Sequence, residues 1–197
     1  MAITCPECGR EYDVTLFDFG RTIRCTCGAR VVMEHRARPL ADPPRFAADA
    51  MLGRLARWLR ALGYDVAHDP TLNDAALVRL AFEGRRTLLT RDRRLCDDWR
   101  IRGCAVLEAR KPAGQLREVV DRLGLDRDWE RRLFTRCMVC NTPLEPADEE
   151  AVRDDLPTGS ASPEGPFARC PGCGRVYWEG QHTRRMRRFL ARVFEEV

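Results

Sequence analysis

The fold class is decided by residues 45–67, RFAADAMLGRLARWLRALGYDVA. Residues 45–48 are expected to form a short first strand that ends at Asp49. Apolar residues then recur at positions 51, 52, 55, 58, 59 and 62, which is the spacing of an amphipathic helix. Residues 64–67 are expected to form a second strand. The stretch therefore predicts a strand–helix–strand unit.

The residues that follow continue this alternation of strands and helices. We expect a helix capped by Asp74 that extends to about Glu83, a third strand at residues 87–90 and a fourth strand at residues 104–107. Such alternation predicts an α/β fold with a mostly parallel sheet flanked by helices and joined by right-handed crossovers. Sites in parallel sheets lie outside the carboxyl ends of the strands.

Three aspartates stand at or near those strand ends. Asp49 and Asp92 each follow a predicted strand, and Asp74 opens the helix between two strands. Clustered carboxylates repel one another unless a cation offsets their charge, and all-oxygen ligands favour Mg²⁺ or Mn²⁺ over zinc. Such ions activate water and neutralise the charge on a cleaved phosphodiester, so phosphodiester hydrolysis fits this ligand set. For Asp74 the alternative is a plain helix N-cap.

Eight of the ten cysteines form two groups of four. Tetrahedral Zn²⁺ prefers four soft ligands, and two thiolates on each of two tight turns supply them. Because each group fills all four ligand positions, we expect two structural zinc ribbons rather than a catalytic zinc. The predicted ligands are Cys5, Cys8, Cys25 and Cys27 in the first ribbon and Cys137, Cys140, Cys170 and Cys173 in the second.

The alternatives to zinc are a disulfide framework and an iron–sulfur cluster. The first residues, MAITCPECGR, lack the apolar run of a secretory signal, and no apolar segment is long enough to span a membrane. We therefore expect a cytoplasmic protein without a membrane partner, where reducing conditions favour zinc over disulfides. Cys96 and Cys104 fall outside the two groups and are expected to be buried free thiols.

Positive charge gathers near the C-terminus. Arginine suits bidentate contact with phosphate, although a GC-rich genome also enriches it. A C-terminal amphipathic helix, with Met186, Phe189, Leu190 and Val193 on its apolar face, is expected to present its arginines to nucleic acid. The alternative is an ordinary solvated helix face. The candidate nucleic-acid ligands are Arg184, Arg185, Arg187 and Arg188.

The chain is expected to have four parts. They are an N-terminal zinc ribbon at residues 1–35, a linker at 36–44, the α/β core at 45–130, and a C-terminal zinc ribbon with the basic helix at 131–197.

Several longer motifs occur in a fixed order along the chain. They are RFAADAMLGRLARWLRALGYDV at 45–66, RRTLLTRDRRL at 85–95, RCMVCNTPL at 136–144 and RCPGCGRVYWEGQHTRRM at 169–186. Together they closely resemble the Mut-seven C-terminal RNase family, over roughly residues 45–190. The resemblance implies a PIN-like core with a C-terminal zinc ribbon, and a metal-dependent ribonuclease that uses acidic residues around Mg²⁺ or Mn²⁺. The N-terminal ribbon is an addition to this pattern.

The resemblance also implies roles for particular residues. Asp49, Asp74 and Asp92 match the catalytic aspartates. The expected function is RNA hydrolysis without a small-molecule cofactor, with the zinc ribbons contacting RNA or a ribonucleoprotein. The alternative is a non-catalytic zinc-ribbon protein that binds RNA or serves as a ribosome-associated adaptor. Further candidate site residues are Asp65, Asp97, Asp98 and Arg91.

Overall fold

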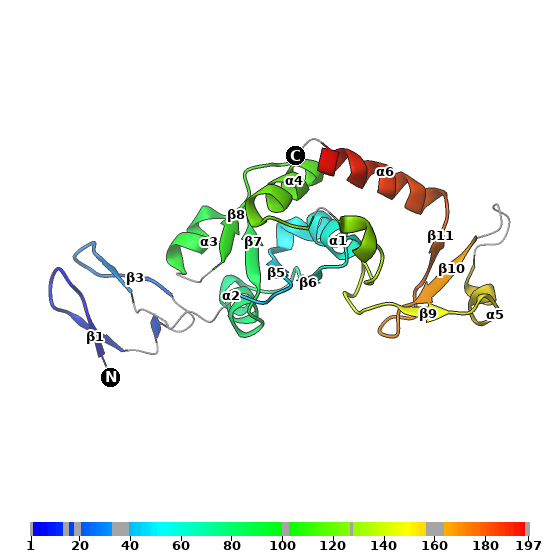
Figure 1. Cartoon of the computed structure of the whole chain (residues 1–197). Helices are drawn as coiled ribbons and strands as arrows, with labels where there is room; N and C mark the ends of the chain where they lie inside the picture. The colour runs from blue at the N-terminus through cyan, green and yellow to red at the C-terminus, as the bar shows by residue number, and fades with distance from the viewer. Residues whose placement is uncertain are drawn as a thin grey trace. The chain divides into compact units, whose positions relative to one another are not determined.

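The computed structural model describes residues 2–13, 16–17, 21–32, 40–99, 103–126, 128–156 and 164–195 (Figure 1). The chain forms two compact units, the first made of Met1–Gly53 with Ala67–Glu108 and the second of Arg54–Val66 with Ala109–Val197. A four-stranded sheet has the order β6-β5-β7-β8. Its strands are β5 (Arg45–Ala48), β6 (Asp65–Ala67), β7 (Thr87–Thr90) and β8 (Cys104–Val106).

The sheet confirms the predicted α/β class. β5 pairs with β7 in parallel, with Ala48 opposite Leu89, and β7 pairs with β8 in parallel, with Thr90 opposite Val106. All four residues of β7 are buried, as expected for a central strand of a parallel sheet. Helices α2 (Asp74–Glu83) and α3 (Arg93–Asp98) follow β6 and β7 along the chain. The core they share with the sheet consists of Ala47, Leu77, Val78, Ala81, Leu88 and Leu95.

Helix α2 begins one residue away from the predicted cap. The side chain of Asn73, not Asp74, accepts a hydrogen bond from the Ala76 backbone N–H at 2.9 Å. Asp74 lies exposed in the first turn, where a negative charge is favourable near the helix N-terminus. The prediction that Asp74 caps this helix is therefore wrong, because the neighbouring asparagine already satisfies the free N–H.

The expectation of free thiols at Cys96 and Cys104 is also wrong. The structure joins these residues in a disulfide, with Cα atoms 5.8 Å apart. Cys96 lies on α3 and Cys104 begins β8, and these two consecutive elements pack against each other. The pairing depends on this packing, which residue types alone do not reveal.

The N-terminal ribbon consists of two antiparallel hairpins within the first unit. One pairs β1 (Ala2–Thr4) with β2 (Glu11–Asp13), and the other pairs β3 (Ile23–Arg24) with β4 (Arg30–Val31). Its small core contains Cys5, Phe17, Cys25 and Val31. So little apolar surface is buried here that a bound metal would supply much of the stability of the ribbon.

The second unit is built around two long amphipathic helices, α4 (Pro112–Leu123) and α6 (Gln181–Glu195), which contact each other. The predicted apolar face of α6 is confirmed, because Met186, Leu190 and Val193 are buried and Phe189 stacks on Trp58 at 4.3 Å between ring centroids. The remaining helices are α1 (Gly53–Ala61) and the short α5 (Glu149–Val152). Three 3₁₀ turns are η2 (Ala50–Leu52), which precedes α1, η3 (Trp129–Arg132) and η4 (Arg153–Asp155). An antiparallel sheet contains β9 (Glu145–Ala147), β10 (Glu164–Arg169) and β11 (Val176–Glu179).

Gly63 makes the turn between α1 and β6. Its φ is +79°, which favours glycine, and a Cβ there would lie 2.5 Å from the Arg132 carbonyl oxygen. Within the described residues, no helix is both long and apolar enough to cross a membrane.

Candidate functional site

Two of the predicted aspartates lie at the carboxyl ends of adjacent strands. Asp49 directly follows β5, and Asp92 comes two residues after the end of β7. Because β5 and β7 are parallel neighbours, both residues belong to the same edge of the sheet. We call this edge the carboxylate edge and define it by Asp49, Thr90 and Asp92.

Thr90, the last residue of β7, connects the two aspartates. Its hydroxyl donates a hydrogen bond to Asp49 Oδ2 at 2.6 Å and accepts one from the Asp92 backbone N–H at 2.9 Å. Thr90 is fully buried, so both hydrogen bonds are shielded from competing water. The Asp92 carboxylate is fixed in turn, because its Oδ1 caps α3 by accepting from the Arg94 backbone N–H at 2.8 Å.

Each carboxylate keeps one oxygen available. Among the described residues, Asp49 Oδ1 and Asp92 Oδ2 receive no hydrogen bond. Asp92 is exposed and Asp49 is half-buried, so a ligand can approach both groups. Mg²⁺ commonly binds one or two carboxylates and keeps several of its waters, and the donor set of this edge fits such an ion.

Two residues at the other strand ends were missed by the sequence prediction. His68 follows β6, and its Nε2 lies 3.2 Å from the carbonyl oxygen of Ala50, the residue after Asp49. Glu108 follows β8 and pairs with Arg93 at 2.6 Å. The rule that singled out Asp49 and Asp92, a polar residue within two positions of a strand end, would also have found these two.

The three predicted aspartates do not come together as one group of metal ligands among the described residues. Within the described residues, the groups of three or more metal-binding side chains with ligand atoms inside 4.8 Å are the two cysteine groups alone. Asp49, Asp74 and Asp92 therefore do not form a third group of that kind.

The additional candidates lie in different places. Asp65 begins β6, and its carboxylate accepts a hydrogen bond from the Asn141 side chain at 2.7 Å. Asp97 and Asp98 are the exposed last residues of α3. Arg91 directly precedes Asp92, and its Nε is buried without a hydrogen-bond partner among the described residues.

The cysteines assemble as predicted into two groups that could hold a metal ion. In each group the four sulfur atoms lie within 4.8 Å of one another, and two of the four cysteines are buried. A hydrogen bond with Thr142 lowers the pKa of Cys140 to about 6, and one with Tyr12 lowers the pKa of Cys25 to about 5. Both effects favour the thiolate form that binds metal, and four sulfurs at this spacing fit one zinc ion.

The C-terminal cysteine loop is anchored by a buried arginine. Arg60 on α1 is 6% exposed and donates to the carbonyls of Met138 and Val139 at 3.3 and 2.7 Å, inside the loop from Cys137 to Cys140. The same guanidinium donates twice to the Val66 carbonyl, at 3.0 and 2.8 Å. Burial lowers the pKa of Arg60, and the nearby cysteine sulfurs oppose that shift.

Asn141 completes this anchor from the other side. It has a φ of +71°, and its side-chain oxygen accepts from the Val66 backbone N–H at 2.9 Å. Through these hydrogen bonds, Arg60 and Asn141 together attach the cysteine loop to α1 and β6.

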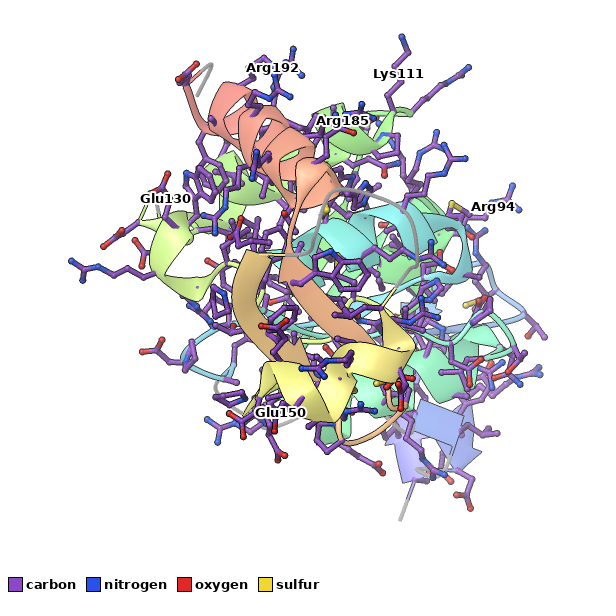
Figure 2. The ribbon with its side chains drawn as sticks, turned by 90° about the vertical axis from the view of Figure 1, so that its right-hand side faces the viewer. Arg94, Lys111, Glu130, Glu150, Arg185 and Arg192 are labelled. Carbon is purple, nitrogen blue, oxygen red and sulfur yellow. A yellow bond between two sulfur atoms is a disulfide. The ribbon has the colours of Figure 1, made fainter. Side chains whose placement is uncertain are left out.

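The arginines of α6 differ in exposure and pairing. We call the exposed row of Arg184, Arg188 and Arg192 the outer stripe. Arg184, Arg188 and Arg192 recur every four residues and are exposed, and Arg185 is exposed beside them. Arg187 instead pairs with Glu179 at 2.8 Å, with its guanidinium 5.7 Å from the Phe134 ring centroid. The labelled basic side chains of the second unit, Lys111, Arg185 and Arg192, lie at the upper side of Figure 2, and Glu150 lies at its lower side.

Comparison with known proteins identifies a family. Residues 44–190 match the family model described as the Mut7-C RNAse domain, and this match covers most of the chain. No curated protein and no solved structure matches the chain.

Proposed function

Because the chain belongs to the Mut7-C RNAse domain family, we propose that it is a PIN-like ribonuclease that hydrolyses RNA phosphodiester bonds with Mg²⁺ or Mn²⁺ at the carboxylate edge. The observation that carries this proposal is the Thr90 hydroxyl, which ties Asp49 to the Asp92 backbone at the ends of two parallel strands. The buried Thr90 fixes the Asp49 carboxylate and the Asp92 backbone, and the Arg94 backbone N–H fixes the Asp92 carboxylate, before any ligand binds.

The residues of the edge have separable tasks. Thr90 occupies one oxygen of Asp49, which leaves the other oxygen available to a ligand. Capping of α3 does the same for Asp92. A bound Mg²⁺ or Mn²⁺ supplies an activated water and offsets negative charge on the phosphodiester. In this proposal Arg91, the residue before Asp92, contacts a phosphate oxygen through its guanidinium.

The outer stripe of α6 is the proposed RNA contact. Arg192 lies eight positions after Arg184, so the three arginines extend over about 12 Å of helix. A row of guanidinium groups of this length suits two or three consecutive phosphates of one RNA strand. Arg187 contributes less in this proposal, because its charge is already matched by Glu179.

The experiment is a metal-dependence test of the intact chain with its zinc content verified. A panel of labelled single-stranded and hairpin RNAs is incubated with Mg²⁺, Mn²⁺ or Ca²⁺, or with a mild chelator that leaves zinc in place. We expect cleavage with Mn²⁺ and Mg²⁺ and none with the chelator. Cleavage that persists at full rate in chelator would contradict the carboxylate mechanism.

A second candidate is RNA binding without cleavage. It is favoured by one observation, that the three predicted aspartates do not meet as a single ligand group among the described residues. In this case the exposed arginines of α6 hold RNA and the carboxylates only cap and stabilise the fold. The zinc-loaded chain would then bind RNA with a strong salt dependence and leave every RNA of the panel intact.

A further inference from the structure

The N-terminal ribbon contacts the core at the C-terminal end of α3. The backbone N–H of Thr22 donates to the Asp98 carbonyl, and the Arg30 guanidinium donates to the Asp97 carbonyl. Arg21 pairs with Trp99 as an isolated antiparallel bridge, and its guanidinium lies 5.7 Å from the Trp99 ring centroid. The second hairpin and the two residues before it thus contact three successive residues at the end of α3, which are Asp97, Asp98 and Trp99.

This attachment suits the chemistry of a helix terminus. The last carbonyls of a helix have no partner within the helix, and they carry partial negative charge. Thr22 and Arg30 supply the missing donors, and Arg30 also supplies a positive charge. Trp99 in turn packs against the core cluster that contains Leu88 of β7 and Leu95 of α3. The ribbon therefore contacts the helix whose N-cap is Asp92, and Trp99 connects this contact to the core cluster.

The opposite end of α3 is Asp92. Asp92 is the N-cap of this helix, and the helix has only six residues, which is about 9 Å of rise. Between the two ends, the disulfide from Cys96 to Cys104 ties the helix to β8. Asp97 lies five positions after Asp92 in the same short helix, so we expect a displacement at Asp97 to shift the Asp92 carboxylate as well.

We propose that the N-terminal zinc ribbon is a positioning module for the reaction site, which orients α3 and thereby the Asp92 carboxylate. The proposal rests on the function proposed above for the carboxylate edge. Arg30 is its main positioning residue, because its side chain holds a carbonyl of α3. Arg24 lies opposite Arg30 on the same hairpin and is exposed, and its side chain makes no contact with the core among the described residues.

These two arginines give a matched pair of variants in the full chain. Arg30→Gln should lower kcat for RNA cleavage on the order of tenfold and leave KM nearly unchanged, because a displaced carboxylate affects the reaction and not the capture of RNA. Arg24→Gln should change neither constant, and Arg30→Lys should recover most of the rate. Reduction of the disulfide with a dithiol should enlarge the effect of Arg30→Gln, because the ribbon is then the remaining tether at that end of the helix.

Equal rises in KM for Arg30→Gln and Arg24→Gln, with kcat unchanged, would overturn the proposal and make the ribbon an RNA-binding surface. A second readout is independent of cleavage. Backbone amide exchange of residues 93–99 should be faster in Arg30→Gln than in Arg24→Gln, with zinc content equal in both. Equal exchange overturns the positioning role, whether or not the wild type cleaves RNA, whereas failure of the wild type to cleave counts against the proposed function alone.

Discussion

The C-terminal cysteine loop and the carboxylate edge are both candidate metal sites, yet they are built in opposite ways. The cysteine group of this loop brings four sulfurs within 4.8 Å of one another, and hydrogen bonds of Arg60 and Asn141 hold the loop to α1 and β6. The carboxylate edge has two carboxylates that are each held by one oxygen, with the other oxygen left over. A closed ligand set stabilises a fold, and an open one leaves room for a substrate and for water. We therefore expect changes in the loop to alter stability and changes at the edge to alter activity.

The largest expected effect is the loss of a cysteine ligand. The wild type should contain two zinc equivalents, and Cys137→Ser should contain one and lose the folded C-terminal ribbon. Zinc binding contributes roughly 10–16 kcal/mol in small structural sites, far more than a loop of this size gains from packing. Elemental analysis with thermal melts measures this, and Cys96→Ser, outside both groups, is the control that keeps two equivalents. A Cys137→Ser protein that retained both would contradict the closed-site interpretation.

The second-largest effect is expected from the loss of Arg60, the buried arginine that anchors the C-terminal cysteine loop. Arg60→Gln should lower the free energy of unfolding by about 2–4 kcal/mol, because the carbonyls of Met138, Val139 and Val66 lose their donor and the Val66 hydrogen bonds are buried. Arg57→Gln, an exposed neighbour on the same helix, should stay within about 0.5 kcal/mol of the wild type. Urea unfolding of the zinc-loaded proteins compares the two. Equal stability of both variants would mean that the anchor is not what holds the loop to α1.

At the open site, Thr90→Val tests whether the shared hydroxyl positions the aspartates. It should reduce the cleavage rate about 10–100-fold, equivalent to about 1.4–2.7 kcal/mol in the activation barrier. The loss of stability should be smaller, on the order of 1 kcal/mol, for one hydrogen-bonding hydroxyl replaced by a methyl group of similar shape. Thr90→Ser keeps the hydroxyl and should keep most of the activity. Full activity of Thr90→Val would show that the Thr90 hydroxyl does not position the aspartates for the reaction.

The smallest effect is expected on the exposed stripe of α6. A triple variant with Arg184→Gln, Arg188→Gln and Arg192→Gln should bind RNA more weakly, and the slope of log affinity against log salt should become shallower by about 0.7 for each phosphate that an arginine no longer neutralises. Its melting temperature should hardly change, because these side chains are exposed. Arg187→Gln should leave the slope close to that of the wild type. Identical slopes for the wild type and the triple variant would show that the stripe is a solvated face.

Much of the core was predictable because its strands are short apolar runs with clear ends. The predicted strands at 45–48 and 87–90 agree with β5 and β7, and the other two differ from β6 and β8 by one residue at one end. The cysteine groups were predictable because their ligands come in closely spaced pairs. These are local signals, and each can be found within a window of about twenty residues.

The contacts between distant residues were not predictable in the same way. The hydrogen bond from Thr90 to Asp49 depends on the register of two strands that are 41 residues apart in the sequence. Arg60 reaches the Met138 carbonyl across 78 residues, and the docking of Arg30 on Asp97 crosses 67. Such pairs form only when the complete fold brings the residues together, so the Arg60 anchor could not be predicted from the sequence.

The most direct test of the account measures cleavage of a single-stranded RNA, with Mn²⁺ present, by the wild type and by Asp49→Asn and Asp92→Asn. Asparagine keeps the shape of each side chain and removes its charge, so both variants should fold normally and cleave on the order of a thousandfold more slowly. Asp121→Asn, an exposed carboxylate on α4, should retain the wild-type rate. The account is contradicted if the wild type cleaves and the folded Asp49→Asn and Asp92→Asn proteins cleave at the same rate.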